Sequence, residues 1–345
     1  MGLLANGIDG GSNRQGIGRR NFWAECHAHC ILRPQFCFHD CMPTRSARTT
    51  DVFLLLVVLI WGANFPIIKW ALAAMPPHAV NVFRFVVSAA MLGGLYAWER
   101  RGTTTAFFAP MRTHGRQLVT LGIVGYVLYQ VCFIIGVNHT TAGSAALIMA
   151  SSPLWTALIG RFSGQEALAR GSWAGLVVSL VGTALVVAAG PSTVGVGSLW
   201  GNALMLAAAV LWGAYTAYNK RVVDDVSPTG ATFMGILVAL PLLIAIGLPD
   251  LPHVAWQAVD VWVWVAIVFS GGLSTGIAFV IWNTAVKDVG ASNTAIYGNL
   301  VPFVALLGGF LFLDEPVRWP QLVGGLLIIG GLLLVRRNRR GALAS

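Results

Sequence analysis

The sequence predicts an all-α integral membrane protein, with ten transmembrane helices arranged as two inverted five-helix repeats. Three observations lead to this prediction: an apolar composition, ten long apolar segments and an internal duplication. Of the 345 residues, 56% are hydrophobic and 10% are charged, and the mean hydropathy is +0.73. Because an ordinary soluble domain carries about 25% charged residues, this composition is typical of a protein that lies largely in lipid.

Ten apolar segments are long enough to cross a bilayer, which takes about 20 predominantly apolar residues per helix. They lie at residues 52–72, 79–97, 117–137, 140–160, 172–190, 197–217, 229–248, 261–283, 290–312 and 320–335. Short turns with proline and glycine separate them, as at Pro76-Pro77 and Gly190-Pro191. We therefore expect one helix for each segment.

The positions of lysine and arginine predict the orientation, because cytoplasmic loops carry an excess of positive charge. With the amino terminus inside, the inner loops and the tail carry Arg100, Arg101, Arg112, Arg116, Arg161, Arg170, Lys220, Arg221, Lys287, Arg336, Arg337, Arg339 and Arg340. The outer loops carry only Arg318. This asymmetry predicts a multi-pass protein of the cell inner (plasma) membrane with both termini in the cytoplasm.

An internal duplication relates the two halves of the chain. Residues 142–187 align without a gap with 291–336, so that Pro153 matches Pro302 and Glu166 matches Glu315. Earlier in each half, Trp61-Gly62-Ala63 matches Trp212-Gly213-Ala214, and Lys69 matches Lys220. Each copy holds five spans, an odd number, so the second copy enters the membrane from the opposite side. Inverted repeats are an architecture of secondary transporters, and they indicate transport through a site near the bilayer midplane.

The repeat divides the chain into a first repeat (51–190), a second repeat (191–337), an N-terminal extension with a basic leader (1–50) and a basic cytoplasmic tail (338–345). Four of the five cysteines and three of the seven histidines lie before Pro43, which raises the alternative of a metal site. Their spacing does not fit the usual zinc motifs, so we expect no metal ligands here. The other interpretation is an extension without function that precedes a true start at Met42.

Four motifs resemble the EamA family of the drug/metabolite transporter superfamily. They are Trp61-Gly62-Ala63-Asn64-Phe65-Pro66-Ile67-Ile68-Lys69, Arg84-Phe85, Ser152-Pro153-Leu154 and Leu313-Asp314-Glu315-Pro316. The resemblance covers about residues 51–337 and depends on the order of the motifs together with the duplication. It implies a two-repeat exporter or importer of amino acids, related metabolites or toxic compounds.

Several polar, aromatic and proline residues are candidates for contact with a substrate. Pro153 and Pro302 break the helical hydrogen-bond ladder at matching places, beside Ser152 and Asn299, and the alternative is a packing kink. Helical spacing groups other residues on shared faces, where they line a cavity or join helices. The candidate substrate-binding residues are Trp61, Asn64, Arg84, Tyr126, Tyr129, Gln130, Ser152, Pro153, Trp212, Tyr215, Ser274, Tyr297, Asn299 and Pro302.

Arg84 is the most informative of these candidates. A charge within a membrane span is costly and by default indicates function, although an arginine near a helix end can snorkel to the headgroups. No aspartate or glutamate lies deep in any predicted span, so an anionic substrate group or a carbonyl is the expected partner of Arg84. The same observation disfavours a simple proton-coupled mechanism. Lys69 lies closer to its helix end, and we expect it to snorkel.

Other function classes receive little support from the sequence. There is no phosphate-binding glycine loop, nucleophile elbow or zinc-protease motif, so we expect no enzyme, no catalytic residues and no cofactor. The net charge of +9 is spread over loop clusters, which disfavours nucleic acid as a partner. The expected partners are a small-molecule substrate, the lipid bilayer and, as a further option, a second copy of the chain.

We expect an exporter that works by alternating access. One alternative is a translocator of phosphorylated or nucleotide-linked sugars, which would favour more basic residues in the cavity. The other is an integral-membrane enzyme, which would need clustered histidines or acids, whereas His78, His139 and His253 are isolated.

Overall fold

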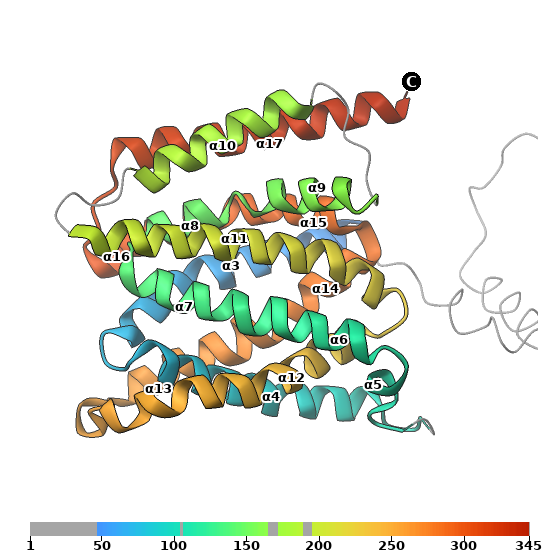
Figure 1. The fold of residues 1–345 in the computed structure, drawn as a ribbon, viewed down its shortest axis with the longest axis vertical. Helices are drawn as coiled ribbons and strands as arrows, with labels where there is room; N and C mark the ends of the chain where they lie inside the picture. Colours follow the sequence, from blue (N-terminus) through green and yellow to red (C-terminus); the bar gives the residue numbers. More distant parts are fainter. Residues whose placement is uncertain (1–46, 104–105, 165–171, 189–194, 345) are drawn as a thin grey trace, which may run out of the picture. The chain divides into compact units, whose positions relative to one another are not determined.

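The computed structural model describes residues 47–344 except 104–105, 165–171 and 189–194. Residues 1–46 of the predicted extension, with its cysteines and histidines and the start at Met42, lie outside the described residues, whereas residues 47–50 begin the first described helix. All regular elements in the described part are helices (Figure 1). Seven helices are long and apolar enough to cross a membrane, and shorter apolar helices lie at Trp173–Val186, Tyr297–Leu313 and Trp319–Gly331. A multi-pass helical protein is therefore confirmed, and the count of ten spans stays a prediction.

The first half of the chain contains α3 (Ala47–Leu72), α4 (Pro77–Glu99), α5 (Ala109–Thr113), α6 (Gly115–Leu121), the π-helix η1 (Gly122–Leu128), α7 (Tyr129–His139), α8 (Ala142–Met149), α9 (Ser152–Phe162) and α10 (Ser172–Ala188). The second half contains α11 (Gly195–Val223), α12 (Pro228–Gly247), the short helices η2 (Leu248–His253) and η3 (Trp256–Ala258), α13 (Val261–Val268), the π-helix η4 (Phe269–Ile277), α14 (Ala278–Val289), α15 (Ala291–Ala295), η5 (Ile296–Leu300), α16 (Val301–Leu313) and α17 (Trp319–Ala344). The last helix thus continues into the segment expected to be a tail.

Two of the expected helices are interrupted at matching places. Residues 140–160 form α8 and α9 with a break between them, and residues 290–312 form α15, a 3₁₀ segment and α16. Pro153 and Pro302 each stand in the first turn of the helix after the break, where the missing N–H of proline has no intrahelical acceptor to lose. The prolines therefore begin new helices rather than kink continuous ones.

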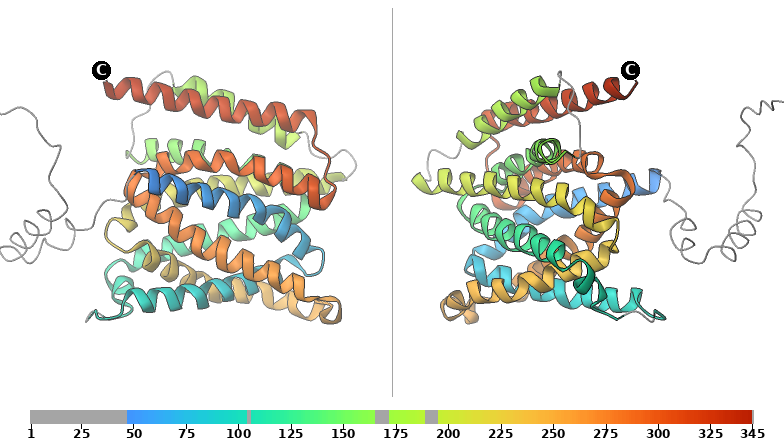
Figure 2. Two further views of the ribbon diagram at one scale, coloured as in Figure 1. Left: turned by 180° about the vertical axis from the view of Figure 1, so that it is seen from behind. Right: turned by 45° about the vertical axis from the view of Figure 1, so that its right-hand side comes forward.

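The two halves pack against each other through pairs of equivalent helix contacts. The first helix of each half packs against the fourth of the other, α3 on α16 and α11 on α9, and α4 lies against α12 (Figures 1 and 2). The end of α3 and the start of α11 meet at one end of the bundle, because Lys69 Nζ donates to the carbonyl of Thr140, whose hydroxyl donates to Asn202. These equivalent helices therefore run in opposite directions.

The last helices of the halves, α10 and α17, lie side by side (Figures 1 and 2). Glycines allow their backbones to approach closely. A Cβ at Gly182 would lie 2.6 Å from the carbonyl oxygen of Gly324, and one at Gly331 would lie 2.4 Å from that of Gly175. Because Gly175 matches Gly324 and Gly182 matches Gly331 in the duplication, the contact has the same exchange symmetry as the rest of the fold.

Candidate functional site

A central cavity lies between the two halves and receives side chains from both. Its volume is about 60 Å³, which is room for a few water molecules. Its lining consists of Trp61, Asn64, Phe65, Arg84, Tyr129, Gln130, Phe133, Ala146, Met149, Ser152, Trp212, Ser274, Thr275, Phe279, Trp282, Gly298 and Val301. The breaks between α8 and α9 and between η5 and α16 reach this lining at Met149, Ser152, Gly298 and Val301.

Arg84 brings the one charged side chain of the described lining into the cavity. It is only 1% exposed. Its Nη1 donates to Asn81 Oδ1 at 3.3 Å and its Nη2 to Thr275 Oγ1 at 3.1 Å, while its Nε has no partner in the structure. Both acceptors are neutral. The guanidinium is therefore buried with no counter-ion on the described lining, and it does not snorkel to a membrane surface.

The backbone of α4 packs directly against the backbone of η4 at Arg84. A Cβ at Gly271 would lie 2.3 Å from the carbonyl oxygen of Arg84, so this approach requires a residue without a side chain. Since Thr275 is on the same π-helix, the close contact also places the hydroxyl that accepts from the guanidinium. The position of the charge thus depends on the packing of α4 and η4.

Aromatic side chains form much of the remaining wall. Trp61 and Trp212, which are equivalent in the duplication, meet edge to face with ring centroids 5.3 Å apart. Trp282 lies 4.9 Å from Trp61, and Phe279 lies 5.0 Å from Trp212. Tyr129 packs on Trp212 at 5.2 Å. The cavity therefore combines one cation with a wide apolar and aromatic surface.

A buried network of neutral groups lies beside the cavity. The hydroxyls of Tyr126 and Tyr215 are 2.8 Å apart, and Asn283 Nδ2 lies 2.9 Å from Tyr215 Oη. Asn283 also donates to Thr232 and accepts from Asn219, both at 2.8 Å. Tyr126 and Tyr215, which we expected as substrate contacts, hydrogen bond to each other here and do not line the cavity.

The other predicted residues fall into two groups. The lining includes Trp61, Asn64, Arg84, Tyr129, Gln130, Ser152, Trp212 and Ser274. Outside it, Pro153 and Pro302 begin helices, and Asn299 is buried with an unpartnered Oδ1. Tyr297 Oη donates to Asp51 Oδ1 at 2.6 Å, near the start of α3. Whether any of these side chains binds a substrate stays a prediction.

Three lining residues on the eighth predicted helix were not among the predicted candidates. Thr275, Phe279 and Trp282 stand at i, i+4 and i+7, which is the spacing of one helical face, and this signal was present in the sequence. Of that segment, only Ser274 is among the candidates predicted from the sequence. Two aromatics in an otherwise apolar run also fit a surface that faces lipid, so tertiary packing decides their direction.

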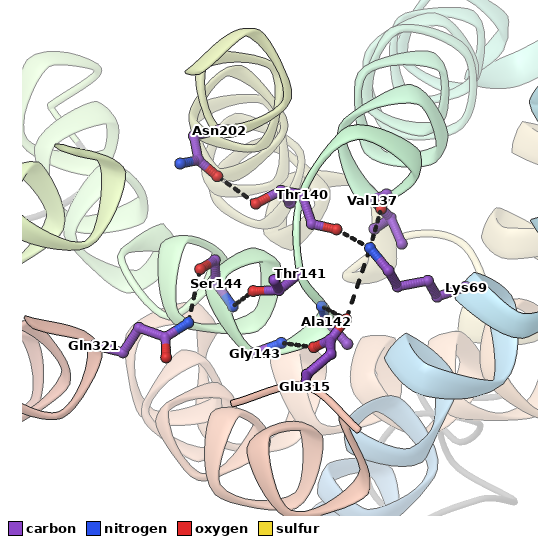
Figure 3. A network of polar contacts seen from close by, with 10 residues as sticks. All are labelled: Lys69, Val137, Thr140, Thr141, Ala142, Gly143, Ser144, Asn202, Glu315 and Gln321. Carbon is purple, nitrogen blue, oxygen red and sulfur yellow. Dashed lines mark hydrogen bonds and ion pairs between the residues drawn. The ribbon is translucent and has the colours of Figure 1, made fainter. Parts of the chain in front are cut away.

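A polar cluster joins the end of α3, the start of α8 and the segment before α17 (Figure 3). Glu315 accepts from the backbone N–H groups of Ala142 at 3.0 Å and Gly143 at 3.4 Å, and so caps the start of α8. Lys69 Nζ lies 3.7 Å from Glu315 Oε1 and donates to the carbonyl of Thr140. The ammonium group of Lys69 thus has protein partners, and whether the side chain also snorkels to the headgroups stays a prediction.

A second cavity, between α3 and α16, is lined by apolar residues such as Ile67, Leu307 and Leu311. No charged, hydroxyl or amide side chain of the described residues lines it. The indole N–H groups of Trp70 and Trp262 are the polar side-chain groups of its described lining. Because it has no charged group to orient a ligand, the central cavity is the better candidate for a binding site.

The sequence profile of the EamA-like transporter family matches residues 48–188 and 199–337. The chain belongs to this family. One match lies in each half of the chain, and the resemblance drawn from the four motifs is thereby confirmed. The helical, two-repeat structure with its apolar helices agrees with a membrane transporter.

Similar proteins align with most of this EamA-like transporter. "Uncharacterized transporter YyaM" of Bacillus subtilis is 26% identical over 82% of this chain and 92% of its own length. A "Probable terminal-alkyne amino-acid exporter" of Streptantibioticus cattleyicolor is 29% identical, with coverages of 84% and 93%. A "Probable amino-acid metabolite efflux pump" of Escherichia coli is 26% identical, with coverages of 84% and 95%. One crystal structure superposes with a TM-score of 0.59 over 87% of this chain and 100% of that chain, and at 20% identity it shows the fold alone.

Proposed function

We propose that this EamA-like transporter exports small amino-acid-related metabolites across the plasma membrane, and that they pass through the central cavity. The observation that carries the proposal is the buried guanidinium of Arg84, which stands between the two halves without a counter-ion on the described lining. A buried charge of this kind is costly to insert and indicates function. The names of the relatives in Streptantibioticus cattleyicolor and Escherichia coli support export of amino-acid compounds.

Alternating access is the mechanism that the fold supports best. Equivalent helices of the halves run in opposite directions, and the helix breaks at α8/α9 and η5/α16 reach the cavity from corresponding places. Broken helices around a midplane site are a feature of transporters with inverted repeats. We assign the end that holds Lys69 and Glu315 to the outer side, because the positive loops predict that end to face away from the cytoplasm.

The alternatives from the sequence gain less support. A translocator of phosphorylated or nucleotide-linked sugars would be favoured by several cations in the cavity, whereas Arg84 is the one charged side chain of the described lining. For an integral-membrane enzyme, no group of three or more histidine, cysteine, aspartate or glutamate side chains among the described residues could hold a metal.

The test is a comparison of metabolites inside and outside cells that lack the gene, overproduce the protein, or overproduce Arg84→Ala at a matched membrane level. A compound that accumulates outside with the wild-type protein and inside without it supports the proposal. Arg84→Ala should return that compound to the level of the deletion strain. The proposal fails if no compound follows the wild-type protein in this reciprocal way.

A further inference from the structure

We propose that the central cavity selects monoanionic carboxylic acids that carry a small aromatic or apolar body and no ammonium group beside the carboxylate. This inference rests on the proposed function and names the substrate class of the same site. It follows from the charge balance of the lining, from the hydrogen-bonding groups that lack partners, and from the aromatic wall.

The charge balance favours one negative charge. The guanidinium of Arg84 is almost fully buried, and its two hydrogen bonds go to the neutral oxygens of Asn81 and Thr275. A guanidinium has five N–H donors, and it binds a carboxylate best through two parallel bonds. Since Nε has no partner, donors remain for a ligand. A monoanion neutralises the site, whereas a dianion would bring a second buried charge for which the described lining has no cation.

The same balance disfavours an ammonium group. In an α-amino acid the ammonium is one carbon away from the carboxylate, so it would lie close to the guanidinium of Arg84 and be repelled by it. No carboxylate on the described lining is there to receive it. One buried acceptor of that lining without a partner, Gln130 Oε1, is neutral. It can accept from a hydroxyl or an amide N–H of the ligand as well as from an ammonium group.

The wall of the cavity defines the body of the ligand. Trp61, Trp212, Phe279 and Trp282 present ring edges and faces, and aromatic groups pack well against such surfaces in offset or edge-to-face geometry. The Nε1–H of Trp282 has no partner and is a further donor for an oxygen of the ligand.

The experiment measures binding of four compounds that share one benzyl group and differ in charge. They are 3-phenylpropanoate (one negative charge), phenylalanine (zwitterion), phenethylamine (one positive charge) and 2-benzylmalonate (two negative charges). The purified full chain in lipid nanodiscs is titrated at pH 7, and tryptophan fluorescence reports occupancy, since three tryptophans line the cavity. We expect 3-phenylpropanoate to bind about tenfold more tightly than each of the other three, a difference that a single charge-assisted contact supplies.

Variants of Arg84 separate recognition of the carboxylate from simple charge attraction. Arg84→Lys keeps the charge but loses the planar fork, and should weaken binding of 3-phenylpropanoate about tenfold. Arg84→Gln should remove the preference over phenethylamine altogether. Arg116→Gln removes an arginine from the exposed surface of α6 and should leave the order and the affinities unchanged. If an Arg84 variant does not fold, the binding of the four compounds to the wild-type protein tests the inference by itself.

Tighter or equal binding of phenylalanine, phenethylamine or 2-benzylmalonate overturns the inference, and so does the absence of binding by 3-phenylpropanoate. The metabolite comparison distinguishes this failure from that of the proposed function. If a zwitterionic amino acid follows the protein in cells, export stands and the substrate class is wrong. If 3-phenylpropanoate binds as expected but no metabolite follows the protein, the site is as described and the export function is wrong.

Discussion

Replacement of Glu315 by glutamine tests the polar cluster that joins the end of α3, the start of α8 and the segment before α17. The carboxylate of Glu315 accepts from the backbone N–H groups of Ala142 and Gly143 and lies 3.7 Å from Lys69 Nζ (Figure 3). Glutamine keeps an oxygen that can accept from the start of α8, but it removes the charge. The variant therefore loses the attraction to Lys69 and to the positive end of the helix, and it keeps the shape of the side chain.

The expected loss is about 1–2 kcal/mol in the free energy of unfolding. At an effective dielectric constant of about 20, two unit charges 3.7 Å apart attract by about 4.5 kcal/mol. Most of this is offset by desolvation and by water at the side chains, which are 27% exposed for Lys69 and 13% for Glu315. About 0.5–1 kcal/mol then remains for the ion pair, and an anion at a helix N-terminus adds a similar amount.

The assay is equilibrium unfolding in mixed micelles of SDS and a non-ionic detergent, followed by tryptophan fluorescence. Asp314→Asn is the matched control, because it removes the neighbouring negative charge at an exposed position, and asparagine tolerates the left-handed backbone there, where φ is 53°. A double-mutant cycle with Lys69→Met should give a coupling energy of about 0.5–1 kcal/mol. Equal effects of Glu315→Gln and Asp314→Asn, with additive changes in the cycle, would refute the role assigned to the cluster.

Three further predictions concern the ends of the chain and the α10–α17 contact. Deletion of residues 1–41 should leave membrane insertion and export at wild-type levels, and a loss restored by the full chain would contradict this. A reporter fused after Ala344 should be active as a cytoplasmic fusion, and periplasmic activity would exclude the ten-span topology. Gly331→Ala should lower thermal stability in detergent, because its Cβ would lie 2.4 Å from Gly175 O, and overpacking typically costs about 1–3 kcal/mol. Gly330→Ala, whose Cβ meets nothing within 4 Å, is the control and should be neutral.

Much of the fold could be predicted from the sequence because lipid imposes a simple requirement. A spanning helix must satisfy its backbone internally and expose apolar side chains, so hydropathy alone marks each segment. The duplication then predicted that the halves share one plan, and the exchanged contacts of α3 with α16 and of α11 with α9 agree with it. A homodimer remains a prediction.

The lining of the cavity was harder to predict, because it depends on helix phase and on contacts between distant segments. By the i, i+3, i+4 spacing of a regular α-helix, Tyr126 shares a face with Tyr129 and Gln130, but it lies in the π-helix η1. A π-helical turn contains an extra residue and so shifts the face that follows. Tyr126 therefore bonds to Tyr215 beside the cavity, while Tyr129 and Gln130 line it.

The contact between Lys69 and Glu315 could not be predicted from the sequence for a different reason. In the sequence, Lys69 lies near the end of its predicted helix, and snorkelling is the usual expectation for such a residue. Nothing in the neighbouring sequence indicates a carboxylate from the segment before α17. The duplication matched Lys69 with Lys220 but did not show their partners. In the structure Lys220 Nζ donates to the carbonyl of Lys287 at 3.2 Å, as Lys69 donates to that of Thr140.

Arg84, the charged residue of the central cavity, has no equivalent cation in the second half of the chain. The helices therefore follow the duplication, but the charge does not. Arg84 is the eighth residue of α4, which begins at Pro77, and Gly235 is the eighth of α12, which begins at Pro228. A Cβ at Gly235 would lie 2.6 Å from the ring of Tyr126, so a tyrosine of the neutral network fills the place that corresponds to the arginine. Equivalent residues such as Trp61 and Trp212 build the shared wall, but only the first half supplies a cation to the described lining. Because the site is not symmetric, an exchange of the conformations of the two halves does not regenerate the same cavity. We therefore expect the carboxylate of a substrate to stay bound to α4 while the second half moves against it.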